Sequence, residues 1–338
     1  MSDMSMVPGF EDVWRPPVRP HRVKPETLLG SARRSDSDPR ARLSRLSRRA
    51  PEVMVKVTGR TRDAGTLRAH LDYISRNGKL ELEDRDGGLL TGRGDVKDVA
   101  DAWSETARLD RLTRANSPLS LSLMLSMPAG SDPTKVRDAA RAFASTVFAG
   151  EHDYVFALHT DTPHPHVHMA ISARGDMGQR LNPKKADLEL WRQVFAQALR
   201  DRGIDAEATP RRARGVTRKA ERTHLRKIRE RHEAGLGPMS RVKRSAYSEA
   251  AKAAFQGDTE RRIWERKLVE RQTAVRTLYL QQARLLARSN DPSDRAFAEK
   301  VEAFVRTMPQ PDSERLALAR ELRDANRNLA RAPPERTR

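Results

Sequence analysis

The sequence predicts an α+β protein in which helices cover a central, mostly antiparallel sheet and an all-α basic tail follows. Two observations lead to this class. Between residues 51 and 215, short segments with strand-like alternation are separated by segments with helical spacing, an order that predicts a sheet covered by helices. Beyond about residue 212, strand patterns cease and the remaining segments are helical and heavily charged.

A basic segment precedes the folded domain. Residues 1–50 are rich in proline, serine and arginine, as in RPPVRPHRVKP and SARRSDSDPRARLSRLSRR, and lack sustained apolar periodicity. We therefore expect a mostly disordered basic arm over 1–50. A folded domain is expected over 51–215, and a helical basic region over 216–338.

The first half of the domain alternates between the two periodicities. EVMVKV, directly after Pro51, alternates as a strand, and TLRAHLDYISRNG has helical spacing that stops at Asn77 and Gly78. DVKDVADAWSETARL predicts a helix, and LSLSLMLSMP alternates strictly from Leu119 to Met127 as a strand. The apolar face expected for that helix consists of Val96, Val99, Ala100, Trp103 and Ala107.

The second half repeats this order. Asp132 and Pro133 fit the N-cap and first position of a helix. Two strands follow, around VFAL and VHMAI, and a turn between them predicts a hairpin. ADLELWRQVFAQALRDRG then predicts a closing helix that ends at Gly203. The apolar stripe expected for the helix after Pro133 consists of Val136, Ala140, Phe143 and Val147.

Composition restricts the classes of function. The net charge of +19 over 338 residues favours a polyanionic partner such as DNA or RNA. An anionic membrane is the competing interpretation, but no stretch approaches the ~18 consecutive apolar residues of a spanning helix and we expect no membrane insertion and no signal peptide. The absence of cysteine excludes disulfides and thiolate metal sites, and fits a reducing cytoplasm.

Four of the nine histidines lie within ten positions in HTDTPHPHVH. His166 and His168 share one face of a strand, because side chains two residues apart point the same way. His159 ends the preceding strand, and the turn can bring it opposite the pair. Three neutral imidazoles with open coordination positions suit Mn, Zn, Co or Ni. His164 lies in the turn without an assigned role, and Asp161 fits either an acceptor that orients an imidazole or an ordinary turn residue.

A metal ion near a basic surface indicates phosphodiester chemistry, with water or a side chain as the nucleophile. Without cysteine, a side-chain nucleophile is Ser, Thr or Tyr, and the chain has four tyrosines. Tyr154 faces away from His159, while Tyr247 and Tyr279 lie in the helical region, where packing is the usual role. Tyr73 lies on the flank of an apolar stripe, a position that suits an active-site residue. That stripe consists of Leu67, His70, Leu71 and Ile74.

Two motifs together resemble a known family. LDYISRNGKLELE resembles the tyrosine motif of plasmid relaxases of the mobilisation and T-DNA border-nicking class, and HTDTPHPHVHMAIS resembles their His-hydrophobe-His motif. Both stand in the family's order and spacing, with SMPAG between them, and the likeness covers roughly residues 51–215. The family frequently has Asn where this chain has Ser172.

The resemblance implies an α+β relaxase fold and a site- and strand-specific endonuclease. It implies that Tyr73 is the nucleophile, with Asp161 in a supporting role, and that His159, His166 and His168 bind a divalent metal, Mg or Mn in the first place and otherwise Zn, Co or Ni. The implied partners are single-stranded DNA of an origin of transfer, accessory relaxosome proteins and a type IV secretion coupling protein. The implied setting is the bacterial cytoplasm, with a plasmid, and transfer of the protein to a recipient cell. The terminal stretch ARAPPERTR would then be a secretion signal, although a solvated end explains it equally well.

Three alternatives remain open. A replication initiator or transposase nuclease of the same superfamily would share the histidines, although such enzymes often place their tyrosine differently. A non-catalytic basic DNA-binding protein would bind DNA without cutting it. A metal hydrolase that uses water would cut DNA without becoming attached to it.

Overall fold

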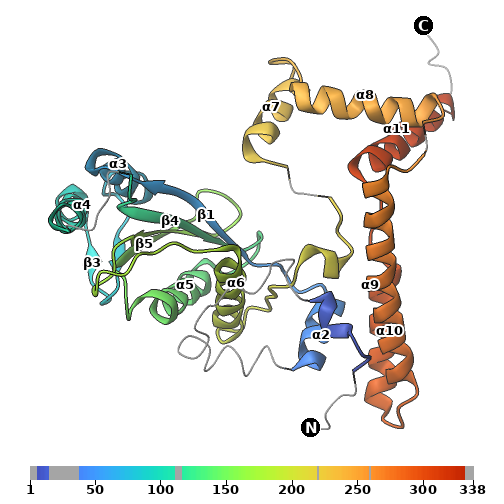
Figure 1. The fold of residues 1–338 in the computed structure, drawn as a ribbon, viewed down its shortest axis with the longest axis horizontal. Coiled ribbons are helices and arrows are strands. Elements are labelled where there is room, and N and C mark those ends of the chain that lie inside the picture. The colour runs from blue at the N-terminus through green and yellow to red at the C-terminus, as the bar shows by residue number, and fades with distance from the viewer. Residues whose placement is uncertain (1–5, 15–37, 111–115, 219–220, 259, 332–338) are drawn as a thin grey trace, which may run out of the picture. The chain divides into compact units, whose positions relative to one another are not determined.

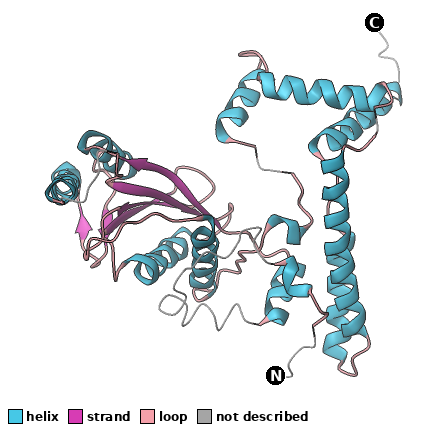
Figure 2. Ribbon diagram, in the orientation of Figure 1, coloured by secondary structure: helices cyan, strands magenta, loops and turns pink. Residues whose placement is uncertain are grey.

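The computed structural model describes residues 6–14, 38–110, 116–218, 221–258 and 260–331. The chain divides into two compact units. The sheet unit comprises Met1–Met4 and Arg15–Thr209, and the helical unit comprises Ser5–Trp14 and Pro210–Arg338. Helices and strands are coloured separately in Figure 2.

A six-stranded sheet forms the centre of the sheet unit, in the order β1-β4-β6-β5-β2-β3. Each strand pairs antiparallel with its neighbours. β4, β6 and β5 each lie between two other strands, so both strands of the predicted hairpin are internal to the sheet. The strands are β1 (Met54–Thr61), β2 (Leu82–Asp84), β3 (Leu89–Leu90), β4 (Ser120–Ser126), β5 (Tyr154–His159) and β6 (His166–Ser172).

Helices cover both faces of this sheet (Figure 1). On one face, α5 (Pro133–Phe148) and α6 (Lys185–Arg200) pack on alternate residues of the central strands, such as Leu123 of β4 and Met169 of β6. On the other face, α3 (Ala64–Ile74) and α4 (Gly92–Leu109) pack on Ala157 and Ala170. Small side chains on this second face let α3 lie close to the strands that carry the histidines.

The predicted fold class is confirmed, and several local predictions are confirmed with it. The leucines of β4 are buried on the α5 and α6 side, as the strict alternation requires. The Asp132 side chain accepts hydrogen bonds from the backbone N–H groups of Thr134 and Lys135, so it is the N-cap of α5, and Pro133 follows at the first position. The predicted apolar faces of α4 and α5 are buried or half-buried.

Three local predictions differ from the structure. α3 ends at Ile74, two residues earlier than expected, because Arg76 already has a φ of 54° in the left-handed region. The short hairpin of β2 and β3 was not predicted, since two- and three-residue strands are too short to show a periodicity. Within the segment expected to be a disordered arm, the structure contains η1 (Phe10–Val13) and α2 (Pro39–Ser47).

α2 forms because this segment has a capping residue, a proline in the first turn and apolar residues at helical spacing. The overall composition of residues 1–50 does not reveal these features. Asp38 caps the backbone N–H of Arg40, Pro39 occupies the first turn, and Leu43 and Leu46 are fully buried. Arg45 donates to the buried carboxylate of Glu207 at 2.7 Å. Residues 15–37 lie outside the described residues, so the extent of a disordered arm stays a prediction.

The helical unit consists of helices that pack in pairs, α9 with α10 and α8 with α11. Tyr279 of α9 is fully buried, stacks edge-on against Phe10 and Phe304, and donates its hydroxyl to the carbonyl of Ala213 at 2.9 Å. The elements are η2 (Arg211–Arg214), α7 (Thr223–Glu233), α8 (Arg241–Phe255), α9 (Ile263–Ala287), α10 (Pro292–Arg306) and α11 (Glu314–Arg331).

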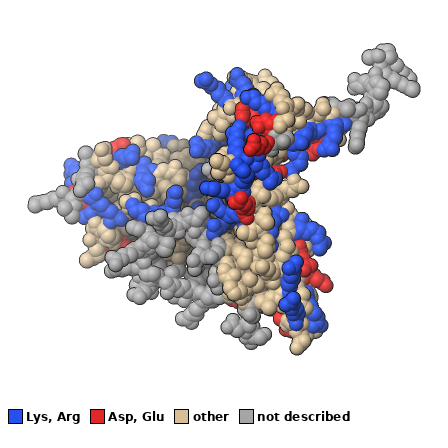
Figure 3. All heavy atoms as spheres, turned by 45° about the vertical axis from the view of Figure 1, so that its right-hand side comes forward, with Lys and Arg blue, Asp and Glu red and all other residues tan. Residues whose placement is uncertain are grey.

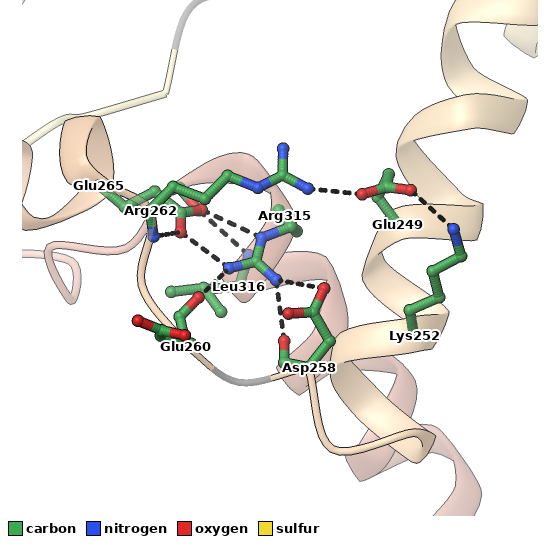
Figure 4. A network of polar contacts seen from close by, with 9 residues as sticks. Glu249, Lys252, Asp258, Glu260, Arg262, Glu265, Arg315 and Leu316 are labelled. Carbon is green, nitrogen blue, oxygen red and sulfur yellow. Dashed lines mark hydrogen bonds and ion pairs between the residues drawn. The ribbon is translucent and has the colours of Figure 1, made fainter.

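A buried ion pair joins the start of α9 to the start of α11 (Figure 4). Arg315 donates to Glu265 at 2.8 Å and to the carbonyls of Asp258 and Glu260 at 2.9 and 2.8 Å. Ser313 also donates to Glu265. Burial alone would raise the pKa of Glu265, but the hydrogen bonds from Arg315 and Ser313 lower that pKa to about 2. The carboxylate is therefore held in its charged form, with every partner supplied from the helical unit.

Lys and Arg side chains outnumber acidic ones over much of the face drawn in Figure 3, in keeping with the formal charge of +19. Within the part of the chain that the structure describes, no helix has the length and apolar character needed to cross a membrane.

Candidate active site

The hairpin of β5 and β6 brings three histidines together on one face of the sheet. His159 pairs with His166 across the hairpin, and His168 pairs with Ala157, two residues further along each strand. The ring centroids lie 5.4 Å apart for His159 and His166, 4.7 Å for His159 and His168, and 5.1 Å for His166 and His168. One nitrogen from each ring lies within 4.8 Å of those of the other two. We call these residues the histidine triad.

Backbone carbonyls orient two rings of the triad. Nε2 of His159 lies 2.8 Å from the carbonyl of Ile74, and Nδ1 of His166 lies 3.0 Å from the carbonyl of His164. Because a carbonyl only accepts, these nitrogens carry the protons, which leaves Nδ1 of His159 and Nε2 of His166 as the acceptor nitrogens of their rings. His164 therefore contributes its backbone to the site, while its side chain is exposed.

The surroundings of His159 and His168 favour the neutral imidazole, the form that binds metal ions. Burial, followed by the charges of His159 and His166, lowers the pKa of His168 to about 4. Burial also lowers the pKa of His159, and the nearby Arg76 lowers it further. Three converging ring nitrogens, on two rings of which the outer nitrogen is bonded to a backbone carbonyl, fit a divalent transition-metal ion.

Tyr73 lies beside the triad. Its ring centroid is 5.4 Å from that of His168 and 6.3 Å from that of His159, and the side chain is 55% exposed. Leu67, Leu71 and Ile74 fix the opposite side of α3 in the core. The helix therefore presents Tyr73 at the edge of its buried stripe, where the ring meets both the histidines and solvent.

The other tyrosines have different surroundings. Tyr154 is 2% exposed and packs in the core under α5 and α6, on the sheet face opposite to the triad. Burial raises its pKa. Tyr279 is fully buried in the helical unit, and Tyr247 is 39% exposed on α8 of that unit.

Asp161 lies in the turn between the two histidine strands. Its carboxylate accepts a hydrogen bond from Arg76, which lowers the Asp161 pKa, and its Oδ1 is 3.9 Å from Nε2 of His166. Arg76 thus links this carboxylate to His159. At 3.9 Å the carboxylate is too far from His166 for a hydrogen bond that would orient that imidazole.

Two further residues at the site were not singled out from the sequence as functional. Arg76 contacts both Asp161 and Nδ1 of His159, at 3.3 Å from the latter. His70, one turn before Tyr73, lies 3.4 Å from the hydroxyl of Ser122 through Nδ1, and burial lowers its pKa. For Arg76 the available signal in the sequence was the Asn77-Gly78 pair, which marks a turn directly after the tyrosine helix.

Ser172 lies at the far end of β6 from His166. Its hydroxyl donates to the carbonyl of Arg174 at 2.8 Å. This side chain is therefore engaged with local backbone and not with the triad.

Comparisons with known proteins agree with this arrangement. Residues 73–204 match the family model "Relaxase: MobA/VirD2-like, nuclease domain". "T-DNA border endonuclease VirD2" of Rhizobium radiobacter is 27% identical over 184 residues, 49% of this chain and 43% of that protein. The protein of the same name from Agrobacterium fabrum is 26% identical over 206 residues, 53% of this chain and 46% of that protein.

The chain thus spans less than half the length of these curated relatives. A weak structural similarity, with a TM-score of 0.31 and 15% identity, covers 48% of this chain and 99% of a chain solved for "Molecular Basis of Vancomycin Resistance Transfer in Staphylococcus aureus". The family match itself begins at Tyr73 and includes the whole histidine triad. The resemblance predicted from the two motifs is therefore confirmed: residues 73–204 of this chain are similar to the relaxase nuclease domain of the MobA/VirD2-like type.

Proposed function

We propose that this chain is a site- and strand-specific DNA relaxase that nicks a single-stranded origin of transfer. The Tyr73 hydroxyl loses its proton and its oxygen attacks the scissile phosphorus. The new P–O bond to tyrosine replaces the bond to the DNA 3′ oxygen, which leaves and takes up a proton. One phosphoester bond replaces another, so the 5′-phosphotyrosyl link retains the bond energy needed to rejoin the strand.

The observation that carries this proposal is the position of Tyr73. An exposed tyrosine lies with its ring 5.4 Å from His168, at the open edge of three converging imidazoles. Its ring can reach solvent, and thus a DNA strand, without leaving the histidines. Of the tyrosines in the described residues of the sheet unit, Tyr154 cannot do so because it is buried.

His159, His166 and His168 would hold a divalent cation, Mg or Mn in the first place, with Zn, Co or Ni as alternatives. When bound, such an ion polarises the phosphoryl oxygen and neutralises the charge that develops in the transition state. The chain's own backbone fixes the ring orientations through the carbonyls of Ile74 and His164. Asp161 plays a supporting role through its ion pair with Arg76.

The basic charge supports a polyanionic substrate. Single-stranded DNA is the partner that suits an excess of arginine, which binds phosphate in a bidentate manner and stacks on unpaired bases. We assign sequence recognition and chemistry to the sheet unit, and mainly non-specific affinity to the helical unit.

The cellular role proposed is conjugative transfer of plasmid DNA from the bacterial cytoplasm. Accessory relaxosome proteins and a type IV secretion coupling protein would be the protein partners. The proposed secretion signal at the basic C-terminal end falls almost entirely on residues 332–338, outside the described residues.

The test is a covalent adduct. The full chain is incubated with Mn²⁺ and single-stranded oligonucleotides that tile the replicon encoding it, each labelled at its 3′ end. We expect one oligonucleotide to give a labelled protein band that survives denaturation. Cleavage without an attached label would identify water as the nucleophile, and binding without cleavage would identify a non-catalytic DNA-binding protein.

A further inference from the structure

The guanidinium of Arg76 contacts Nδ1 of His159, the nitrogen through which this histidine would bind a metal ion. Nη2 of Arg76 lies 3.3 Å from Nδ1 of His159, while Nε2 of that ring is already bonded to the Ile74 carbonyl. The imidazole therefore has a single lone pair, on Nδ1. A guanidinium proton and a divalent cation cannot share that lone pair, so the two are alternative partners of His159.

The backbone holds Arg76 in this place by an unusual turn. Arg76 and Asn77 both have a left-handed φ, at 54° and 59°. The N–H of Asn77 donates to the Asp72 carbonyl at 2.7 Å, and the N–H of Gly78 donates to the Ser75 hydroxyl at 3.1 Å. Two successive non-glycine residues in this region cost free energy, which the local hydrogen bonds offset.

Gly78 makes the turn possible. A Cβ at this position would lie 2.5 Å from the carbonyl carbon of Gly92, and the φ of Gly78 is also positive. The turn is therefore closely packed, whereas the guanidinium at its tip is not, because the Arg76 side chain remains 40% exposed. A rigid base with a half-exposed cationic end allows the side chain to change partner without a change of fold.

Asp161 keeps the guanidinium at the site in either state. It accepts from the same Nη2 that contacts His159 and lies in the exposed turn between β5 and β6. Other guanidinium nitrogens of Arg76 have no hydrogen bond to a described residue. They can donate to phosphate oxygens of a strand whose scissile phosphate lies at Tyr73, three residues earlier on the same segment.

We propose that Arg76 is a displaceable phosphate-binding residue: its guanidinium and a divalent cation compete for Nδ1 of His159, and once displaced it binds a DNA phosphate beside the Tyr73 site. This inference rests on the proposed function for its DNA part only. Arg76 lowers the cation affinity of the triad in the absence of DNA and raises the affinity for DNA when the cation is present.

The test compares Arg76→Gln with Arg68→Gln in the full chain. Arg68 lies on α3, the helix that leads into the turn of Arg76, and pairs with Asp72. Its substitution removes the same charge, so it controls for long-range electrostatics. Co²⁺ binding is measured by its absorption bands in chelator-treated protein, with His166→Ala/His168→Ala as the baseline. An oligo(dT) strand then reports DNA binding by fluorescence anisotropy at fixed Mn²⁺.

We expect Arg76→Gln to bind Co²⁺ about tenfold more tightly than Arg68→Gln, and to bind oligo(dT) several-fold more weakly. The opposite signs are diagnostic, because a merely structural role for Arg76 would weaken both. Equal Co²⁺ affinity in the two variants would overturn the competition while leaving the proposed nicking activity intact. If no variant, including the unmodified chain, binds Co²⁺ above the baseline, both the competition and the metal site are wrong.

Discussion

Each unit of the chain places a tyrosine on a helix, and the two side chains have opposite surroundings. Tyr73 of α3 is 55% exposed and its ring lies beside those of His159 and His168, whereas Tyr279 of α9 is fully buried between Phe10 and Phe304 with its hydroxyl bonded to a backbone carbonyl. A hydroxyl with a permanent partner inside a core stabilises packing. A ring at the edge of a histidine cluster is available for chemistry, so surroundings and not residue type separate the two roles.

The buried ion pair of the helical unit and the histidine triad of the sheet unit differ in the same way. In the helical unit, Glu265 and Arg315 satisfy one another and nearby carbonyls within the fold. In the sheet unit, the triad keeps nitrogen lone pairs directed toward one another and toward Arg76. The ion pair thus has its partners within its own unit, whereas the triad offers acceptor nitrogens that a ligand can take up.

Removal of two triad histidines should have the largest effect. His166→Ala/His168→Ala deletes two of three converging nitrogens, and we expect the loss of Co²⁺ or Mn²⁺ binding and a fall in DNA cleavage of more than about 10²-fold. His224→Ala/His232→Ala on α7 is the matched control in the helical unit. Isothermal titration calorimetry and adduct formation provide the readouts, and full cleavage by the triad variant would exclude the site.

Disruption of the buried ion pair should unfold one unit and spare the other. Glu265→Gln leaves the buried Arg315 with the half-exposed carboxylate of Asp258 as its remaining counter-charge, and we expect it to destabilise the helical unit by about 3 kcal/mol. Hydrogen exchange in α9 and α11 should accelerate, while exchange in β4 and β6 remains unchanged. Glu249→Gln, which breaks only half-exposed pairs to Lys252 and Arg262, should change exchange far less. Faster exchange throughout both units would contradict the independent stability of the two units.

Acid should destabilise the sheet unit through its histidines. The pKa of His168 is lowered from 6.5 to about 4, so between these values the unfolded chain binds a proton that the folded chain does not. Stability is therefore complete above pH 6.5 and falls as the pH decreases to about 4, by on the order of 3 kcal/mol for this residue. His159 and His70 contribute in the same direction.

The measurement is hydrogen exchange of β4 and β6 in chelator-treated protein across this pH range. His168→Gln should flatten the dependence, and His224→Gln on α7 should not. A dependence that is equally steep in His168→Gln would assign the acid sensitivity to other groups.

Neutralising exposed charge on α7 should have the smallest effect. Arg226→Gln, Lys227→Gln and Arg231→Gln together remove three cations from an exposed helix. We expect weaker binding to oligo(dT) and a slope of log affinity against log salt that is smaller by about 2. Adduct yield at saturating oligonucleotide should not change, and its loss would place α7 in the catalytic machinery.

The sequence predicted those parts of the fold and the site that depend on periodicity. The alternation of leucine with other residues in LSLSLMLSM was sufficient to place the leucines of β4 in the core. The two-residue spacing in HVH, together with the hairpin, was sufficient to place the three histidines on the opposite face. The helical stripe was sufficient to put Tyr73 at the edge of a buried surface. These are local rules, and the antiparallel hairpin converts them directly into a cluster.

Features that depend on long-range pairing were not predictable. α2 is stabilised by Glu207, which lies far along the chain, and β2 pairs with β5 through only two residue pairs. Arg76 was missed because its role depends on where the turn after α3 meets the loop after β5. No periodicity in either segment encodes that meeting.

The central claim is that Tyr73 of the sheet unit becomes covalently attached to DNA. The most direct test identifies the residue that carries the DNA. The denaturation-resistant adduct is digested with nuclease and trypsin and examined by mass spectrometry. We predict a nucleotide remnant on the peptide of residues 69–76, AHLDYISR, at Tyr73, and no adduct from Tyr73→Phe, while Tyr247→Phe in the helical unit forms the adduct at the level of the unmodified chain. A remnant on residues 245–252, SAYSEAAK, or an adduct that persists in Tyr73→Phe, would contradict the assignment of the chemistry to the sheet unit.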